Sequence, residues 1–206
     1  MIAAPRAFGT IRLTVVALCV AIAAAVPLSF PADGGATDVD RGVSAPIHEA
    51  LDRHHNLYHA LVVPSDAYIL LPLLLAAGAW FAAHLRWWRA VTMVVVPELV
   101  VAINTWVLKP LFDRPLHDYL AYPSGHTVHL IAIATTFALL TDSAAVRYSV
   151  ATVTAAALGA VAVGMIGLGY HLPTDIVGGV SAAIAMVVIL CWVAQRIAHR
   201  IQRAPG

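Results

Sequence analysis

Long apolar stretches, separated by short polar connections, are the dominant pattern along this chain. Five stretches free of Asp, Glu, Lys and Arg cover residues 13–32, 67–85, 119–141, 148–174 and 176–195, and a sixth, 90–108, is interrupted only by Glu98. A bilayer-spanning helix needs about 20 such residues, and only a helix satisfies its own backbone in hydrocarbon. We therefore predict transmembrane helices near residues 12–30, 67–85, 90–108, 124–141, 148–169 and 175–195.

The first apolar stretch is open to a second interpretation. Arg6 and Arg12 precede it and small residues end it, a pattern that is also typical of a signal peptide. We interpret it as a span because it is long enough to cross the bilayer.

Composition supports an integral membrane protein. Of the 206 residues 61% are hydrophobic and only 11% are charged, whereas soluble domains carry about 25% charged residues. We expect residues 1–206 to form one all-α, polytopic membrane domain, a bundle of six transmembrane helices. The net charge of +1 provides no field to attract nucleic acid. Cys19 and Cys191 lie in apolar runs and are interpreted as small core residues.

The distribution of basic residues orients the spans. With the N-terminus in the cytoplasm, one side carries eight arginines and the other side four basic residues together with most acidic ones. The eight are Arg6, Arg12, Arg86, Arg89, Arg147, Arg196, Arg200 and Arg203. Both termini are therefore predicted to be cytoplasmic. The richness in Ala and Arg suggests a GC-rich bacterial genome, hence a bacterial plasma membrane.

The longest connection, residues 31–66, is expected outside the cytoplasm. Residues 31–46 are predicted to be an irregular loop, and residues 47–63 a short amphipathic helix at the membrane surface. Its histidines His54, His55 and His59 are open to two interpretations, a metal site or a solvated helix that covers the mouth of the active site. Because no third ligand accompanies His55 and His59 on one helix face, we favour the second and predict no metal.

Polar residues gather on the extracytoplasmic side. Lys109, the only lysine, and Arg114 follow the third span, and the segment Pro123-Ser124-Gly125-His126 opens the fourth. His171 and Asp175 join the last two spans. His126 and His171 are 45 residues apart, about two membrane crossings and a turn, which returns the chain to the same side. Ionisable groups at such positions are costly, and this indicates a functional site.

These residue types suit a phosphate site. Ser124 and Gly125 stand at a helix start, where free N–H groups favour an anion, and Lys109 and Arg114 are suitable cations. Asp175 can orient His171 as a nucleophile, which leaves His126 as the general acid.

The chain resembles the type 2 phosphatidic acid phosphatase (PAP2) superfamily of membrane lipid phosphatases over residues 67–195. The resemblance rests on Pro-Ser-Gly-His at 123–126 and on His171-x-x-x-Asp175 followed by Gly178-Gly179. It implies a catalytic core over these residues and a metal-independent phosphoryl transfer without cofactors. In that reaction His171, His126 and Asp175 are catalytic, and Lys109, Arg114, Ser124 and Gly125 bind the phosphate.

Two motifs depart from the family pattern. Lys109 is followed by four residues instead of six before Arg114-Pro115, and Gly164 and Met165 stand where the family has Ser-Arg. One phosphate-binding arginine is therefore absent, and we expect His117 or a histidine of residues 48–59 to compensate in part.

We predict a phosphatase acting on a lipid monophosphate or diphosphate in the outer leaflet. Polyprenyl (pyro)phosphate, phosphatidic acid and phosphatidylglycerophosphate are the candidate substrates. A headgroup phosphotransferase is one alternative, because transferases of this superfamily lack the family's arginines, and a non-enzymatic lipid transporter or scaffold is another. Glu98 is expected to face the bundle interior near Asn104 or Thr105.

Overall fold

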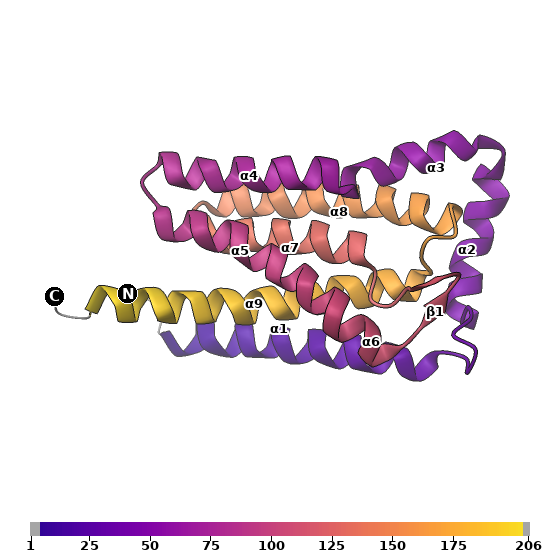
Figure 1. The fold of residues 1–206 in the computed structure, drawn as a ribbon, viewed down its shortest axis with the longest axis horizontal. Coiled ribbons are helices and arrows are strands. Elements are labelled where there is room, and N and C mark those ends of the chain that lie inside the picture. The colour runs from indigo at the N-terminus through magenta and orange to yellow at the C-terminus, as the bar shows by residue number, and fades with distance from the viewer. Residues whose placement is uncertain (1–4, 204–206) are drawn as a thin grey trace.

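Six long helices run along the same axis in the computed structural model, which describes residues 5–203 and the side chains of residues 9–201 (Figure 1). Their bounds are α1 Pro5–Ala25, α4 Ala67–Ala83, α5 Trp87–Ile103, α7 Gly125–Leu140, α8 Ala144–Gly167 and α9 Pro173–Arg203. Each of them overlaps one of the predicted spans over most of its length, although α1 and α5 end about five residues before the predicted boundaries. The predicted all-α helix bundle is therefore confirmed.

Length and composition make this an integral membrane protein. In residues 5–203, five helical stretches are long and apolar enough to cross a bilayer: Gly9–Ser29, Asp38–Ala83, Trp87–Phe112, Ala144–Gly167 and Pro173–Ile201. The sixth helix, α7, is apolar but has only 16 residues. Its partners α5, α8 and α9 surround it, so α7 is the central helix of the bundle.

Helices also fill most of the connection between α1 and α4, where an irregular loop was predicted over residues 31–46. That prediction is wrong for residues 38–46, because α2 extends over Asp38–Leu51. Thr37 caps the helix: its hydroxyl accepts from the Asp40 backbone N–H, and the Asp40 carboxylate accepts from the Thr37 N–H. A 3₁₀ turn, Asp52–His54, leads to α3, His55–Val62. Figure 1 shows α2 across the end of the bundle and α3 beside α8.

Glycines allow the helices to approach closely near the start of α9. A Cβ atom on Gly178 would lie 2.1 Å from the ring of Tyr122, a fully buried side chain that packs edge-on against Phe30 and Phe112. The Tyr122 hydroxyl donates to the Ala23 carbonyl at 2.6 Å, which joins α1 to this contact. Both cysteines are buried and free, as predicted.

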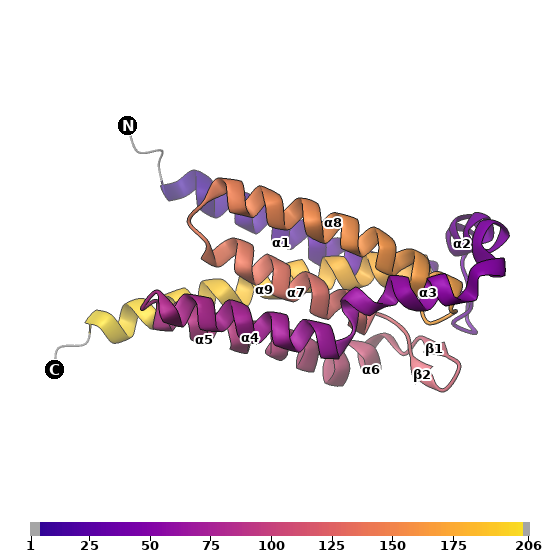
Figure 2. The same cartoon turned by 90° about the horizontal axis from the view of Figure 1, so that it is seen from above.

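The connection from α5 to α7 folds back over the bundle end. A π-helical turn, Asn104–Leu108, leads into α6, Lys109–Phe112, and then into a hairpin of β1, Pro115–Leu116, and β2, Tyr119–Leu120. Figure 2 shows this hairpin at the same end of the bundle as α2. The Asn104 side chain donates to the Pro123 carbonyl at 3.3 Å, so the start of α7 is attached to the end of α5.

The opposite end of the bundle carries an ion-pair cluster. Arg86 and Arg89 donate to the carboxylate of Asp142 at 2.9 and 2.8 Å, which links the start of α5 to the turn after α7. The hydrogen bond from Arg89 is the largest of the effects that hold the pKa of Asp142 below its usual range.

Candidate active site

A cavity of about 450 Å³ opens at the bundle end that carries the hairpin. Its polar lining comes from the 3₁₀ turn before α4, from α6, β2 and α7, and from the turn before α9. It consists of Ser65, Lys109, Tyr119, His126, His129, Tyr170 and His171. Five segments therefore contribute polar side chains to one space. His126 and His171 lie at the same end of the bundle, as predicted.

The two histidines face each other across this cavity. His126 is the second residue of α7, and His171 precedes the first turn of α9. Their ring centroids are 6.2 Å apart and their planes are inclined by 72°. The backbone N–H of Ser124 donates to the Asp175 carbonyl at 3.0 Å, which fixes the start of α7 against the start of α9.

Asp175 lies behind His171, on the side away from the cavity. Its Oδ2 is 3.6 Å from His171 Nδ1 and accepts the Leu172 N–H at 2.8 Å. Nδ1 is buried, and it has no hydrogen-bond partner within residues 5–203. Catalytic hydrogen bonds are often long without substrate, so a small rotation of the ring would complete this pair. Because Nδ1 faces the carboxylate, Nε2 is the nitrogen available for chemistry.

Arg114 does not line the cavity. Its side chain is 1% exposed, and it donates to Asp175 at 2.8 Å and to Asp40 at 3.1 Å. It also donates to the carbonyls of Gly34 and Gly35 at 3.0 and 2.8 Å. The guanidinium is thus engaged by buried oxygen atoms and connects the segment before α2 to the start of α9.

Sequence reasoning missed Asp40, the second carboxylate of this buried network. Asp40 is fully buried, and it accepts from the Thr174 N–H at 2.8 Å and from the Thr174 hydroxyl at 3.0 Å. The sequence does contain one indication, since Thr37-x-x-Asp40 has the spacing of a capping box. Its long-range partners, however, lie more than 70 residues away.

Lys109 is the only lysine or arginine among the described residues that line the cavity. Its ammonium group donates to the Leu120 carbonyl and lies 6.0 Å from the centre of the Tyr119 ring. Burial, followed by the charge of Asp175, raises the pKa of Tyr119, so this tyrosine remains a neutral hydroxyl. The Tyr119 hydroxyl donates to the Tyr170 carbonyl.

Ser124 and Gly125 have different environments although they are neighbours. Gly125 lines the cavity. Ser124 is fully buried, its hydroxyl accepts the Thr127 N–H at 3.5 Å, and the same hydroxyl donates to the sulfur of Met165 at 3.8 Å. In the structure Ser124 thus caps α7 and does not border the open space.

Two acid–histidine pairs near the cavity were not expected. Glu98 lies 3.0 Å from His129 Nε2, and Asp66 lies 3.9 Å from His126 Nε2. The expectation that Glu98 faces the interior near Asn104 or Thr105 is wrong: its side chain is 44% exposed between α5 and α7. Asp66 directly precedes the second span, and this position on the predicted outer side could have indicated it.

A comparison with known protein families finds a match that contains these cavity residues. Residues 97–198, which include all four of Lys109, His126, His171 and Asp175, match the sequence model of the PAP2 superfamily. This part of the chain belongs to the PAP2 superfamily. No curated protein sequence matches the chain significantly.

The bundle is similar to a solved PAP2 structure. The match is a transmembrane PAP2 type phosphatidylglycerolphosphate phosphatase from Bacillus subtilis, with a TM-score of 0.63 and 19% sequence identity. The alignment covers 94% of this chain and 98% of that one. Fold and family together support a phosphatase-type function for this protein.

The packing of α3 explains part of one departure from the PAP2 pattern. Gly164 and Met165 occupy the positions at which the family has Ser-Arg. A Cβ atom on Gly164 would lie 2.7 Å from the Tyr58 carbonyl and 2.8 Å from Val62, so α3 leaves no room for a serine side chain at this position. At the arginine position, the Met165 side chain is fully buried, and its sulfur lies 3.8 Å from the Ser124 hydroxyl.

The histidines expected to compensate do not line the cavity. His117 lies in the tip of the hairpin, at a φ of 54°, and the histidines of residues 48–59 are on α2, α3 and the turn between them. The α3 helix packs along α8 and does not cover the cavity mouth. Within residues 5–203, no group of three or more His, Cys, Asp or Glu side chains could hold a metal ion.

Proposed function

We propose that this protein is a lipid phosphatase that removes a phosphate from a lipid monophosphate or diphosphate through a phosphohistidine intermediate. The observation that carries the proposal is the pair His126 and His171, which face each other across one cavity with Asp175 behind His171. Lys109 supplies a positive charge beside both rings.

In the first step, His171 Nε2 attacks phosphorus while the bond to the lipid oxygen breaks. His126 donates a proton to that leaving oxygen, and the Asp175 carboxylate stabilises the positive charge that develops on His171. Lys109 and the free N–H groups at the start of α7 bind the phosphoryl oxygens. Neither stage of this reaction requires a metal ion or another cofactor.

In the second step, His126 takes a proton from water, and the oxygen of that water attacks phosphorus. The bond between phosphorus and His171 breaks, inorganic phosphate leaves, and both histidines return to their starting states. Asp66, 3.9 Å from His126 Nε2, is suited to hold that ring in place during both proton transfers.

The substrate belongs to the membrane. A cavity at the end of an apolar bundle admits a phosphate headgroup while the lipid tail stays in the bilayer. Polyprenyl (pyro)phosphate, phosphatidic acid and phosphatidylglycerophosphate are the candidate substrates. The distribution of arginines supports a site on the extracytoplasmic face of a bacterial plasma membrane, with both termini in the cytoplasm.

Release of inorganic phosphate by the detergent-purified protein tests this function. We expect release from at least one of these lipids, unchanged by EDTA and lost in His171→Ala. A matched control is His59→Ala, which removes an exposed histidine of α3 outside the cavity and should keep full activity. Brief incubation with ³²P-labelled substrate should give an acid-labile, base-stable label that is absent in His171→Ala. Activity that survives in His171→Ala would overturn the mechanism.

A phosphotransferase is the second candidate. It is favoured by the small number of basic side chains at the site: Lys109 is the only lysine or arginine in the described cavity lining, since Arg114 is bound to buried carboxylates. Turnover that requires an added lipid or sugar acceptor would identify the transferase. A lipid transporter or scaffold would show no turnover that depends on His171.

A further inference from the structure

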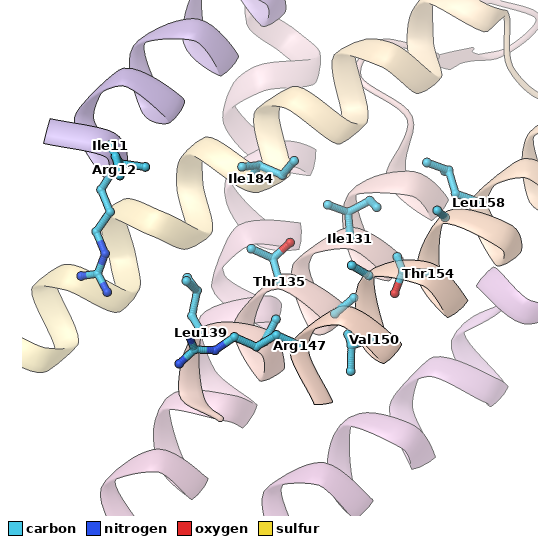
Figure 3. Close-up of a pocket in the computed structure, with 14 residues that line it drawn as sticks. Ile11, Arg12, Ile131, Thr135, Leu139, Arg147, Val150, Thr154, Leu158 and Ile184 are labelled. Atoms are coloured by element: carbon cyan, nitrogen blue, oxygen red, sulfur yellow. The ribbon is translucent and has the colours of Figure 1, made fainter. Parts of the chain in front are cut away.

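A second cavity, of about 480 Å³, opens at the bundle end opposite the histidines (Figure 3). It lies between α1, α7, α8 and α9, and its walls are almost entirely apolar, with Ile131, Val150, Leu158 and Ile184 among them. Along α8 the lining runs from Arg147 to Leu158, about 16 Å at 1.5 Å per residue. A narrow apolar space of this length suits a hydrocarbon chain.

The charge in this groove is concentrated at one end. Arg12 of α1 and Arg147 of α8 both line it, and Figure 3 shows both side chains extending toward the same end of the helices. The Arg147 guanidinium donates to the Thr141 carbonyl at 3.2 and 2.7 Å, and this holds it at the end of α7. None of the described residues that line the groove is acidic. The nearby Asp142 is already paired with Arg86 and Arg89.

We propose that this groove binds an anionic phospholipid of the leaflet at this end of the bundle. One acyl chain fills the space along α8, and the phosphate headgroup lies between Arg12 and Arg147. The groove is complementary to an anionic amphiphile, because its apolar interior is about 16 Å long and two arginines lie at its mouth. A soluble anion would leave the apolar walls in contact with water.

This lipid is distinct from the substrate. His126 and Leu139 stand at opposite ends of α7, and Leu139 lines the groove. Their separation of 13 positions corresponds to about 20 Å, so a headgroup at Arg147 is out of reach of the histidines. The bound lipid instead completes the packing between α1, which lies along α9, and α8, which lies along α7.

Measuring lipid binding to the purified protein tests whether Arg12 and Arg147 bind the lipid headgroup. The probes are phosphatidylglycerol and phosphatidylcholine with identical acyl chains, and native mass spectrometry counts the lipids bound. We expect phosphatidylglycerol to bind more tightly, and Arg12→Gln with Arg147→Gln to weaken it about 25-fold, or about fivefold for each arginine. The charge-matched control, Arg196→Gln with Arg200→Gln on α9, should change the affinity less than twofold.

A substitution inside the groove tests the chain site without changing any charge. Ala155 lines the groove, whereas its exposed neighbour Ala156 does not. Ala155→Leu should weaken phosphatidylglycerol binding about fourfold for each methylene that it displaces, and Ala156→Leu should have no effect. The proposal is overturned if the two lipids bind equally, if both alanine variants behave like wild type, or if a protein dimer without lipid is the species observed.

Discussion

Replacing Arg114 by methionine separates a structural role from phosphate binding. The family pattern implies that this arginine binds the substrate, yet it is 1% exposed and lies between two carboxylates that are both fully buried. Methionine keeps much of the length and apolar volume of the side chain but removes the charge and all of its donors. The substitution therefore leaves Asp40 and Asp175 without their shared cation.

The expected loss of stability is large. Removing one partner of a buried ion pair costs about 3–5 kcal/mol, because the remaining charge stays buried without compensation. In a protein of about 200 residues, 1 kcal/mol lowers the unfolding temperature by about 2–4 °C. Arg114→Met should thus lower it by about 6–20 °C. The double variant with Asp40→Asn should be less destabilised than the single one, because it also removes one of the two uncompensated carboxylates.

Lys109→Met is the matched control, since it removes a cation that does line the cavity. Thermal unfolding in detergent and inhibition by inorganic phosphate would be measured for both variants. We expect Lys109→Met to weaken phosphate inhibition with little change in unfolding temperature, and Arg114→Met to lower the unfolding temperature strongly. The reasoning is refuted if Arg114→Met unfolds like wild type while losing phosphate inhibition as Lys109→Met does.

Three further predictions follow from particular contacts. Gly178→Ala places a methyl group against the immobile Tyr122 ring and should cost about 1–3 kcal/mol; an unchanged unfolding temperature would contradict this. Asp66→Asn should lower kcat and alter its pH profile with little change in KM, because it removes the charge beside His126; an unchanged profile would exclude the contact. The arginine hydrogen bonds lower the pKa of Asp142, so their stabilisation is present above its unfolded pKa, near 4, and is lost as the pH falls through the lower folded value. The difference in unfolding temperature between wild type and Asp142→Asn should accordingly disappear in acid.

The spans were predictable because hydrocarbon imposes one solution on every apolar stretch. Segment 38–46 was not, because Gly42, Ser44 and Pro46 are weak helix formers whose composition resembles that of a loop. What stabilises α2 is its capping box and the contacts of Asp40 with Arg114 and Thr174, residues far away in the sequence.

The same distinction applies to the candidate site. His126 and His171 could be brought together by counting membrane crossings, since two spans return a chain to one side. The environment of Arg114 could not be predicted in this way, because its spacing from Lys109 shows only that both residues lie in the connection between the third and fourth spans. Whether a side chain on that connection turns toward the cavity or into the protein depends on tertiary partners, here the carbonyls of Gly34 and Gly35 and the carboxylate of Asp40.

The buried network also gives a physical account of the two motif departures together. Because Arg114 compensates Asp40 and Asp175, its charge holds the segment before α2 against the start of α9 and is not available to a substrate. Because α3 covers Gly164 and the buried Met165 occupies the arginine position, α8 contributes no cation to the described cavity lining. Arg114 and Gly164 therefore contribute to packing the α2–α3 segment onto the bundle. In the function proposed above, Lys109 and the N-terminus of α7 bind the phosphate. A phosphate site with fewer cations than its relatives should bind inorganic phosphate more weakly, and its affinity should depend mainly on Lys109.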